Sequence, residues 1–406
     1  MTRREYRAQG IAGDERHKVH CNHRRTPVNG GTRVYVWQQK KGGVVSSSAS
    51  NSRALLSVRD LQTHFEVGGH AVKAVDGVSF DVYEGKTLGI VGESGCGKTV
   101  LSRSIMGITT ASNASTSGSV NYSGTELIGK SKRVLRKFWG EEMAMVFQDP
   151  MTSLNPVVRI GRQLTEHLRA HKDLSRSDAN DLAVQLLTWV RIPEPRERLN
   201  NYPHQMSGGM RQRVCIAIAL ACSPKLLFAD EPTTALDVTV QHQILNLLSQ
   251  QQQERQMGMV LVTHDLGVVA TRTDDIAVMY AGKIVEKSST SALFSEMRHP
   301  YTQSLFWSIP KTSEPKHTRL SAIVGRPPNL AALPPGCSFA DRCPYVQPIC
   351  REVEPKLRTI DSHSFACHLP VGSTEGEAAL SANISVGLPQ SEGAAARREA
   401  GQGILT

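Results

Sequence analysis

A glycine-rich segment at residues 92–99 has the composition of a phosphate-binding loop. Its spacing is G-x-x-x-x-G-K-T, and it lies between the apolar run 87–91 and a helical pattern at 100–106. Glycines let backbone N–H groups curl around phosphate oxygens, and the start of a helix adds partial positive charge. Lys98 is expected to reach the β- and γ-phosphates, and Thr99 a Mg²⁺ ion. We therefore predict a site for a nucleoside triphosphate, formed by Gly92, Glu93, Ser94, Gly95, Cys96, Gly97, Lys98 and Thr99.

Two adjacent carboxylates end the apolar run 225–229. Asp230 would suit the water shell of a metal ion, and Glu231 would polarise an attacking water. An exposed turn after a core strand would have the same composition, so the pair alone is weak evidence. Together with the upstream phosphate loop it predicts hydrolysis of the bound nucleotide.

A second phosphate-cradling pattern follows residue 206. Ser207, Gly208 and Gly209 stand at the start of an Arg/Gln-rich helical segment, too far along the chain to belong to the first loop. One chain with two such elements indicates a site that another subunit completes.

The elements that must position these residues alternate along the chain. Buried-strand patterns at 87–91, 225–229 and 259–263 are separated by helical patterns, which favours a parallel sheet with helices on its faces. Residues 150–205 carry apolar positions at helical spacing and are expected to form a helical insertion. Residues 276–287, turning at 281–283, are expected to form a hairpin.

Charge and apolar content bound the class of protein. The 406 residues carry a net charge of +10, of which residues 1–53 hold +8 and the remaining chain +2. The basic balance is therefore a property of one segment and is weak evidence for a nucleic-acid partner. The longest apolar run, 214–222, is nine residues, too short to span a bilayer. We predict a cytosolic chain with disordered tails at 1–53 and 371–406.

The order of these motifs resembles that of ATP-binding cassette (ABC) ATPases. The resemblance rests on the loop at 92–99, Gln148, the Ser-Gly-Gly at 207–209, the carboxylates at 230–231, the segment 234–237 and His264. It implies an α/β fold of the P-loop NTPase class, with a RecA-like core, an antiparallel β subdomain and a helical subdomain at about 150–205. It also implies that ATP lies between two head-to-tail nucleotide domains.

The same resemblance assigns roles within one nucleotide domain. Phe65 matches the aromatic residue that stacks on adenine, although a strand-core phenylalanine would look similar. Gln148 matches the glutamine that senses Mg²⁺ and the membrane subunit, so the implied magnesium set is Thr99, Gln148 and Asp230. His264 matches the switch histidine that contacts the γ-phosphate and holds the water with Glu231.

Other roles concern the partner domain. The resemblance implies that Ser207, Gly208 and Gly209 contact the γ-phosphate of ATP bound on the partner, and that Asp237 lies in the loop that crosses between subunits. The family usually has Gln where this chain has Met210. Because the serine and both glycines remain, we expect the contact to be retained.

Longer phrases at 148–156, 229–241 and 299–302 are similar to those of the peptide and nickel importer branch, and 209–214 is similar to its D-type ATPase. The resemblance implies an ATPase domain at 54–310, a Cys-rich C-terminal domain at 311–370, and ATP-driven di- or oligopeptide uptake at the cytoplasmic face. The implied partners are an F-type ATPase, two permeases and a solute-binding protein. Nickel or another small solute stays open as cargo.

Two alternatives come from other classes. The first is a nucleic-acid or ribosome-associated cassette protein, against which the chain has no long coiled-coil insertion and no second cassette. The second is a redox-sensing regulator that acts through its cysteines.

Four of the eight cysteines gather near the C-terminus with the spacing C-x5-C-x6-C-x16-C. Four thiolates on loops suit a tetrahedral zinc ion or an iron–sulfur cluster, and spacing alone does not decide between them. The resemblance implies a [4Fe-4S] cluster. The four are Cys337, Cys343, Cys350 and Cys367.

Overall fold

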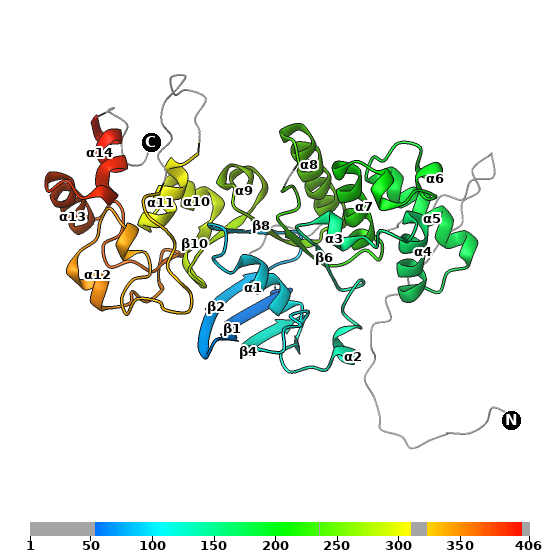
Figure 1. Ribbon diagram of the computed structural model, residues 1–406, viewed down its shortest axis with the longest axis horizontal. Helices are drawn as coiled ribbons and strands as arrows, with labels where there is room; N and C mark the ends of the chain where they lie inside the picture. Colours follow the sequence, from blue (N-terminus) through cyan, green and yellow to red (C-terminus); the bar gives the residue numbers. More distant parts are fainter. Residues whose placement is uncertain (1–52, 235, 310–322, 400–406) are drawn as a thin grey trace, which may run out of the picture. The chain divides into compact units, whose positions relative to one another are not determined.

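The computed structural model describes residues 53–234, 236–309 and 323–399 (Figure 1). The described residues belong to one compact unit. The predicted basic tail at 1–53 lies outside the described residues except for Arg53. Across the described ranges, no helix has both the length and the apolar content needed to cross a membrane.

The central sheet contains eight strands in the order β11-β12-β10-β9-β3-β8-β7-β6. Its parallel part is β9, β3, β8, β7 and β6. Every residue of β3, β7 and β8 is buried, as expected for parallel strands covered on both faces. This confirms the predicted parallel sheet. The bounds are β3 Thr87–Val91, β6 Met143–Val146, β7 Leu226–Asp230, β8 Gly258–Thr263, β9 Asp275–Tyr280, β10 Lys283–Ser289, β11 Arg358–Ile360 and β12 His363–Phe365.

A second sheet of four antiparallel strands has the order β2-β1-β4-β5. Its strands are β1 Leu56–Val67, β2 His70–Val82, β4 Ala114–Tyr122 and β5 Thr125–Glu126. Figure 1 shows β1, β2 and β4 side by side, in blue to cyan. One apolar core joins this sheet to α1 (Lys98–Ile105) and to one face of β3, so the sheet braces the element that follows the phosphate loop.

The predicted helical insertion at 150–205 is confirmed. It contains α3 Pro150–Ser153, α4 Ile160–His171, α5 Arg176–Trp189, α6 Pro195–Arg198 and the 3-10 turn η1 Pro203–Gln205. Ile160, Leu164 and Leu168 stand at the predicted helical spacing and are fully buried. They pack into the same core as α7 (Gly208–Leu220) and α8 (Val238–Arg255).

The predicted hairpin at 276–287 is also confirmed, as β9 and β10. The turn between the strands has positive φ angles at both central residues, 48° at Ala281 and 82° at Gly282. Turns of this type match the right-handed twist of the strands they join. Further helical elements before residue 353 are α2 Lys132–Leu135, α9 Leu266–Arg272, α10 Thr290–Ser295, α11 Pro300–Trp307, η2 Ala340–Arg342 and α12 Pro348–Glu352.

The prediction of a loose tail at 371–406 is wrong over its described part. Residues 374–399 form α13 (Thr374–Ser385), the turn η3 (Pro389–Ser391) and α14 (Glu392–Glu399). Ser373 caps α13 by accepting a hydrogen bond from the N–H of Gly376, and Leu380 is fully buried. A high alanine content favours helix, and a few apolar contacts are enough to dock it.

Candidate nucleotide-binding site

The phosphate loop lies where the sequence predicts it, between β3 and α1. Two of its glycines leave no room for a side chain. A Cβ on Gly92 would lie 2.2 Å from the carbonyl oxygen of Met279, and one on Gly97 would lie 2.0 Å from that of Ala74. Gly97 also has a φ of 105°, in the region that glycine adopts readily. The loop is therefore wedged between β9 and β2, which fixes its path.

Lys98 curls back onto the loop. Its Nζ donates hydrogen bonds to the carbonyl oxygens of Gly92 (2.8 Å) and Glu93 (3.0 Å), and lies 3.8 Å from Oε1 of Glu231. The side chain is only 4% exposed. A buried ammonium held by loop carbonyls beside a carboxylate can exchange those acceptors for phosphate oxygens with little movement.

Thr99 and Asp230 meet across 131 residues of sequence. The Thr99 hydroxyl donates to Oδ1 of Asp230 at 3.1 Å. Asp230 is fully buried, and burial raises the pKa of its carboxyl group. Its Oδ2 has no hydrogen-bond partner within the described part of the chain. A buried carboxylate oxygen without a donor, next to a threonine hydroxyl, fits a Mg²⁺ ion and its bound waters.

Glu231 is the next residue in the chain, and three nitrogen or hydroxyl groups surround one of its carboxylate oxygens. Oε2 accepts hydrogen bonds from Nε2 of Gln148 (3.0 Å) and Oγ1 of Thr234 (2.9 Å), and lies 3.4 Å from Nδ1 of His264. The bond from the histidine is the main cause that lowers the pKa of Glu231, and the same bond raises the pKa of His264. The carboxylate is therefore ionised at neutral pH and able to accept a hydrogen bond from a water molecule.

The backbone of Glu231 is also unusual. Its φ is 44°, in the left-handed region that non-glycine residues rarely adopt. Its N–H nevertheless donates to the carbonyl oxygen of Val262 at 2.9 Å, as if β7 continued for one more residue. The turn directs the carboxylate away from the sheet and toward Gln148, which follows β6.

Phe65 lies half-buried near the end of β1, opposite Val72 on β2 and Ala114 on β4. Ala74, whose carbonyl oxygen closes over Gly97, is two residues further along β2. The structure thus places Phe65 near the end of an inner strand, beside the part of β2 that contacts the phosphate loop. Stacking of its ring on adenine stays a prediction.

The second phosphate-cradling element stands apart from this site. Ser207 caps α7, its Oγ accepting a hydrogen bond from the N–H of Met210, and Asp237 caps α8 in the same way through Val240. A Cβ on Gly209 would lie 2.8 Å from Cγ1 of Val240, so the two helix starts are neighbours. Ser207, Gly208 and Asp237 are exposed, and no hydrogen bond or ion pair between described residues links them to the loop at 92–99.

Comparisons with known proteins agree with this arrangement. The profile of the ABC transporter family matches residues 75–234, and that of the oligopeptide/dipeptide transporter C-terminal region matches residues 285–350. The chain is 49% identical over 322 residues to a probable peptide ABC transporter ATP-binding protein of Sinorhizobium fredii, covering 78% of this chain and 96% of that protein. The chain belongs to the ABC transporter family of ATPases.

Other relatives support the same family assignment. The dipeptide transport ATP-binding protein DppD of Haemophilus influenzae is 46% identical, covering 78% of this chain and 96% of its own. The oligopeptide transport ATP-binding protein OppD of Escherichia coli is 45% identical, covering 78% and 94%. The dimeric ATP-binding cassette MJ0796, solved with ADP and Pi, superposes with a TM-score of 0.53 at 25% identity, covering 58% of this chain and 98% of its own. The predicted ABC ATPase fold is confirmed.

The four C-terminal cysteines of this ABC ATPase surround one small cavity. Burial raises the pKa of Cys337 to about 11 and that of Cys367 to about 12, and raises the pKa of Cys343 strongly. No group of three or more His, Cys, Asp or Glu side chains in the described ranges is placed to hold a metal ion. The thiols therefore share a cavity without forming a ready single-ion site.

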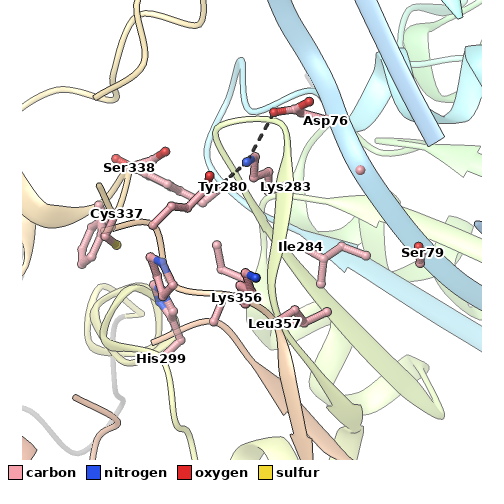
Figure 2. A pocket seen from close by; sticks show the side chains of 16 residues that line it. Asp76, Ser79, Tyr280, Lys283, Ile284, His299, Cys337, Ser338, Lys356 and Leu357 are labelled. Atoms are coloured by element: carbon pink, nitrogen blue, oxygen red, sulfur yellow. Dashed lines mark hydrogen bonds and ion pairs between the residues drawn. The ribbon is translucent and has the colours of Figure 1, made fainter. Parts of the chain in front are cut away.

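Cys337 also lines a larger cavity of about 500 Å³ beside the β9–β10 hairpin. Figure 2 shows Cys337 and Tyr280 together on the wall of this cavity, with Lys283 joined to Asp76. Cys337 and Cys367 are half-buried, whereas Cys343 and Cys350 are buried. Of the two half-buried cysteines, only Cys337 also lines the larger cavity.

Sequence reasoning missed several residues around the phosphate loop. Thr234 lies in the segment 234–237, for which the resemblance implies a role for Asp237 alone. Arg342, from the Cys-rich segment, donates two hydrogen bonds to the carboxylate of Glu93, and Tyr301 accepts the N–H of Glu93 at 2.8 Å. These contacts join residues more than 200 positions apart, and no local pattern could have indicated them.

Proposed function

We propose that this ATPase energises uptake of di- or oligopeptides as the D-type subunit of an ABC importer, at the cytoplasmic face of the membrane. The nucleotide site carries the proposal, because it sets an ionised Glu231 beside Lys98, Asp230 and Thr99. The cargo is supported by the relatives, which are named as dipeptide and oligopeptide transport ATP-binding proteins.

In the proposed reaction, Glu231 accepts a hydrogen bond from the attacking water and aligns it for attack on the γ-phosphate. His264 holds the carboxylate in position, and Lys98 exchanges its loop carbonyls for phosphate oxygens. Mg²⁺, bound near Thr99, Asp230 and Gln148, would neutralise charge on the β- and γ-phosphates.

A second cassette, the F-type subunit, would complete each ATP site. The exposed Ser207, Gly208 and Asp237 support this proposal, because they are polar groups at two helix starts with no link to their own chain's phosphate loop. Val238, next to Asp237, is 72% exposed and would be buried in such a dimer.

Two membrane permeases would dock near Gln148. An apolar cavity of about 240 Å³ opens beside it, lined by Phe147, Trp139 and Leu154 and by residues of β6, α3 and α7. Met151 and Val157, on the same segment, are 62% and 79% exposed. A helix of a permease placed here would sense Gln148 and, through it, Glu231. A solute-binding protein would deliver the cargo to the permeases.

The four cysteines would hold a [4Fe-4S] cluster, with zinc as the alternative. Their donor set and shared cavity support a metal centre. The visible spectrum and metal content of anaerobically purified protein distinguish the two: an iron–sulfur absorption band supports the cluster, and a colourless zinc-containing sample refutes it.

The test of the catalytic assignment is Glu231→Gln in the assembled transporter. ATP turnover should fall almost to zero while the ATP-bound dimer accumulates, and Glu296→Gln, an exposed carboxylate far along the chain, should have no effect. Unchanged turnover in Glu231→Gln would refute the role of Glu231. Uptake assays with peptides, nickel and other small solutes in vesicles that carry the whole transporter decide the cargo.

A further inference from the structure

Glu93 is the first variable residue of the phosphate loop, and the C-terminal part of the chain holds it. Its carboxylate accepts hydrogen bonds from Nη1 (2.5 Å) and Nη2 (2.8 Å) of Arg342, a paired arrangement that fixes both position and orientation. Its N–H donates to the hydroxyl of Tyr301 at 2.8 Å. Neither group of Glu93 is therefore free to bind a nucleotide.

The remaining polar group of Glu93 faces the other way. Its carbonyl oxygen accepts a hydrogen bond from Nζ of Lys98 at 3.0 Å. Glu93 thus has the Cys-rich segment on one side and the phosphate-binding lysine on the other. A movement of Arg342 would be transmitted to Lys98 through Glu93 alone.

Arg342 is itself held firmly. Its side chain is 4% exposed, Nε donates to the carbonyl oxygen of Val324 at 3.1 Å, and Nη1 donates to the hydroxyl of Tyr280 at 3.2 Å. The guanidinium carbon lies 5.9 Å from the ring centres of both Tyr280 and Phe339. A buried guanidinium with this many partners has little freedom, because leaving them would strand a charge in the protein interior.

The position of Arg342 in the chain adds a second connection. It is the last residue of η2, the short turn between Cys337 and Cys343, and its N–H donates to the carbonyl oxygen of Phe339. The conformation that presents Arg342 to Glu93 therefore depends on how this cysteine-bearing segment is folded.

We propose that Arg342 is a positioning residue for the phosphate loop: it holds Glu93, and through Glu93 it fixes the loop path from which Lys98 reaches ATP. The affinity for ATP then depends on the fold of residues 337–350. By thermodynamic linkage, ATP binding must in turn stabilise that segment.

A double-mutant cycle on the full-length chain tests the proposal. The equilibrium Kd for a non-hydrolysable ATP analogue with Mg²⁺ is measured for Arg342→Gln, Glu93→Gln and the double variant. Each single variant should weaken binding about tenfold, and the double variant no more than either single one, because the two residues act through one contact. Arg342→Lys, which keeps the charge but loses the paired geometry, should restore part of the affinity.

Arg351→Gln is the matched control, since Arg351 is an exposed arginine of the same segment that pairs only with Asp341 among described residues. Its Kd should not change. If Arg342→Gln and Glu93→Gln lower the thermal midpoint but leave Kd within twofold of the wild type, the contact is a structural brace and the proposal is wrong. The readout is ATP binding, so the result does not depend on the cargo.

Hydrogen–deuterium exchange gives a second measurement, which remains informative in the wild-type chain even if one variant folds poorly. In the wild-type chain, the analogue should slow exchange at 337–350, and in Glu93→Gln this protection should disappear while the slowing around α1 persists at saturating ligand. Exchange at 337–350 that does not respond to the nucleotide in the wild type overturns the proposal.

Discussion

Replacing Asp230 with Asn should stabilise the nucleotide-free protein and abolish hydrolysis. Asp230 is fully buried, and its Oδ2 has no donor among the described residues, so the charged form is poorly solvated. Burial raises its pKa in spite of the hydrogen bond from Thr99 and the attraction of nearby cationic side chains. The folded chain therefore favours a neutral group at this position.

The increase in the free energy of unfolding can be estimated from these contacts. An unsatisfied buried group costs about 1–3 kcal/mol, and each unit of raised pKa corresponds to about 1.4 kcal/mol. Asn keeps the oxygen that accepts the Thr99 hydroxyl but adds an N–H₂ group where Oδ2 stood, so we expect the lower half of that range, about 1–2 kcal/mol. For a unit of this size the thermal midpoint should rise by about 1–3 °C.

The gain in stability should be larger at neutral pH than at low pH. A carboxyl group whose pKa is raised in the folded state favours folding below the pKa of the unfolded chain, and this contribution is lost as pH rises through the folded pKa. The free energy of unfolding of Asp230→Asn should therefore exceed that of the wild type most clearly at neutral pH. The two free energies should converge as the pH is lowered toward the ordinary pKa of an aspartate.

Denaturation midpoints of both proteins between pH 4 and pH 7.5, with and without Mg-ATP, check this reasoning. Asp237→Asn is the control, because Asp237 is an exposed helix cap that Asn replaces well. In the wild type, ligand at about 100 times its Kd should add about 2.7 kcal/mol, and in Asp230→Asn most of this should be lost. A variant less stable than the wild type at pH 7, or a difference that does not change with pH, would refute the account of Asp230.

Three further outcomes are expected. Gly97→Ala should remove ATP binding in a calorimetric titration, because its methyl group would lie 2.0 Å from the carbonyl oxygen of Ala74; retained affinity would show that the loop can move aside. NMR titration should find the pKa of His264 above its ordinary value, and Glu231→Gln should return it, since their hydrogen bond is the main cause; no change would contradict the pairing. In metal-free protein, mass spectrometry should find Cys337 alkylated first of the four C-terminal cysteines, because it lines the larger cavity; equal rates would contradict this.

The nucleotide site could be predicted from the sequence because phosphate chemistry constrains local segments. A loop that wraps a phosphate needs its glycines and lysine at fixed spacing, and the strand and helix around it have their own apolar periods. The loop, β7 with its two carboxylates and the helical insertion were all predicted for this reason. Asp230 meets Thr99 because the carboxyl ends of the parallel strands β3 and β7, which have β8 between them, lie at one edge of the sheet.

The C-terminal part was predicted less well, and for a physical reason. The prediction for residues 371–406 is a loose tail, yet Leu380 and Ala394 pack in the apolar core that also contains residues of α11. Docking of this kind depends on a surface that is assembled elsewhere in the chain. No window of local sequence contains that information.

Glu93 illustrates where local reasoning stops. In the loop motif its position is variable, because no phosphate contact requires a particular side chain there. In this chain the same residue gives its carboxylate to Arg342, its N–H to Tyr301 and its carbonyl oxygen to Lys98. A position that the shared chemistry of phosphate binding leaves open is available for whatever else the chain attaches to its ATPase core. Residues that are variable in a motif but fully occupied by long-range contacts are therefore where a domain outside the motif can act on the site.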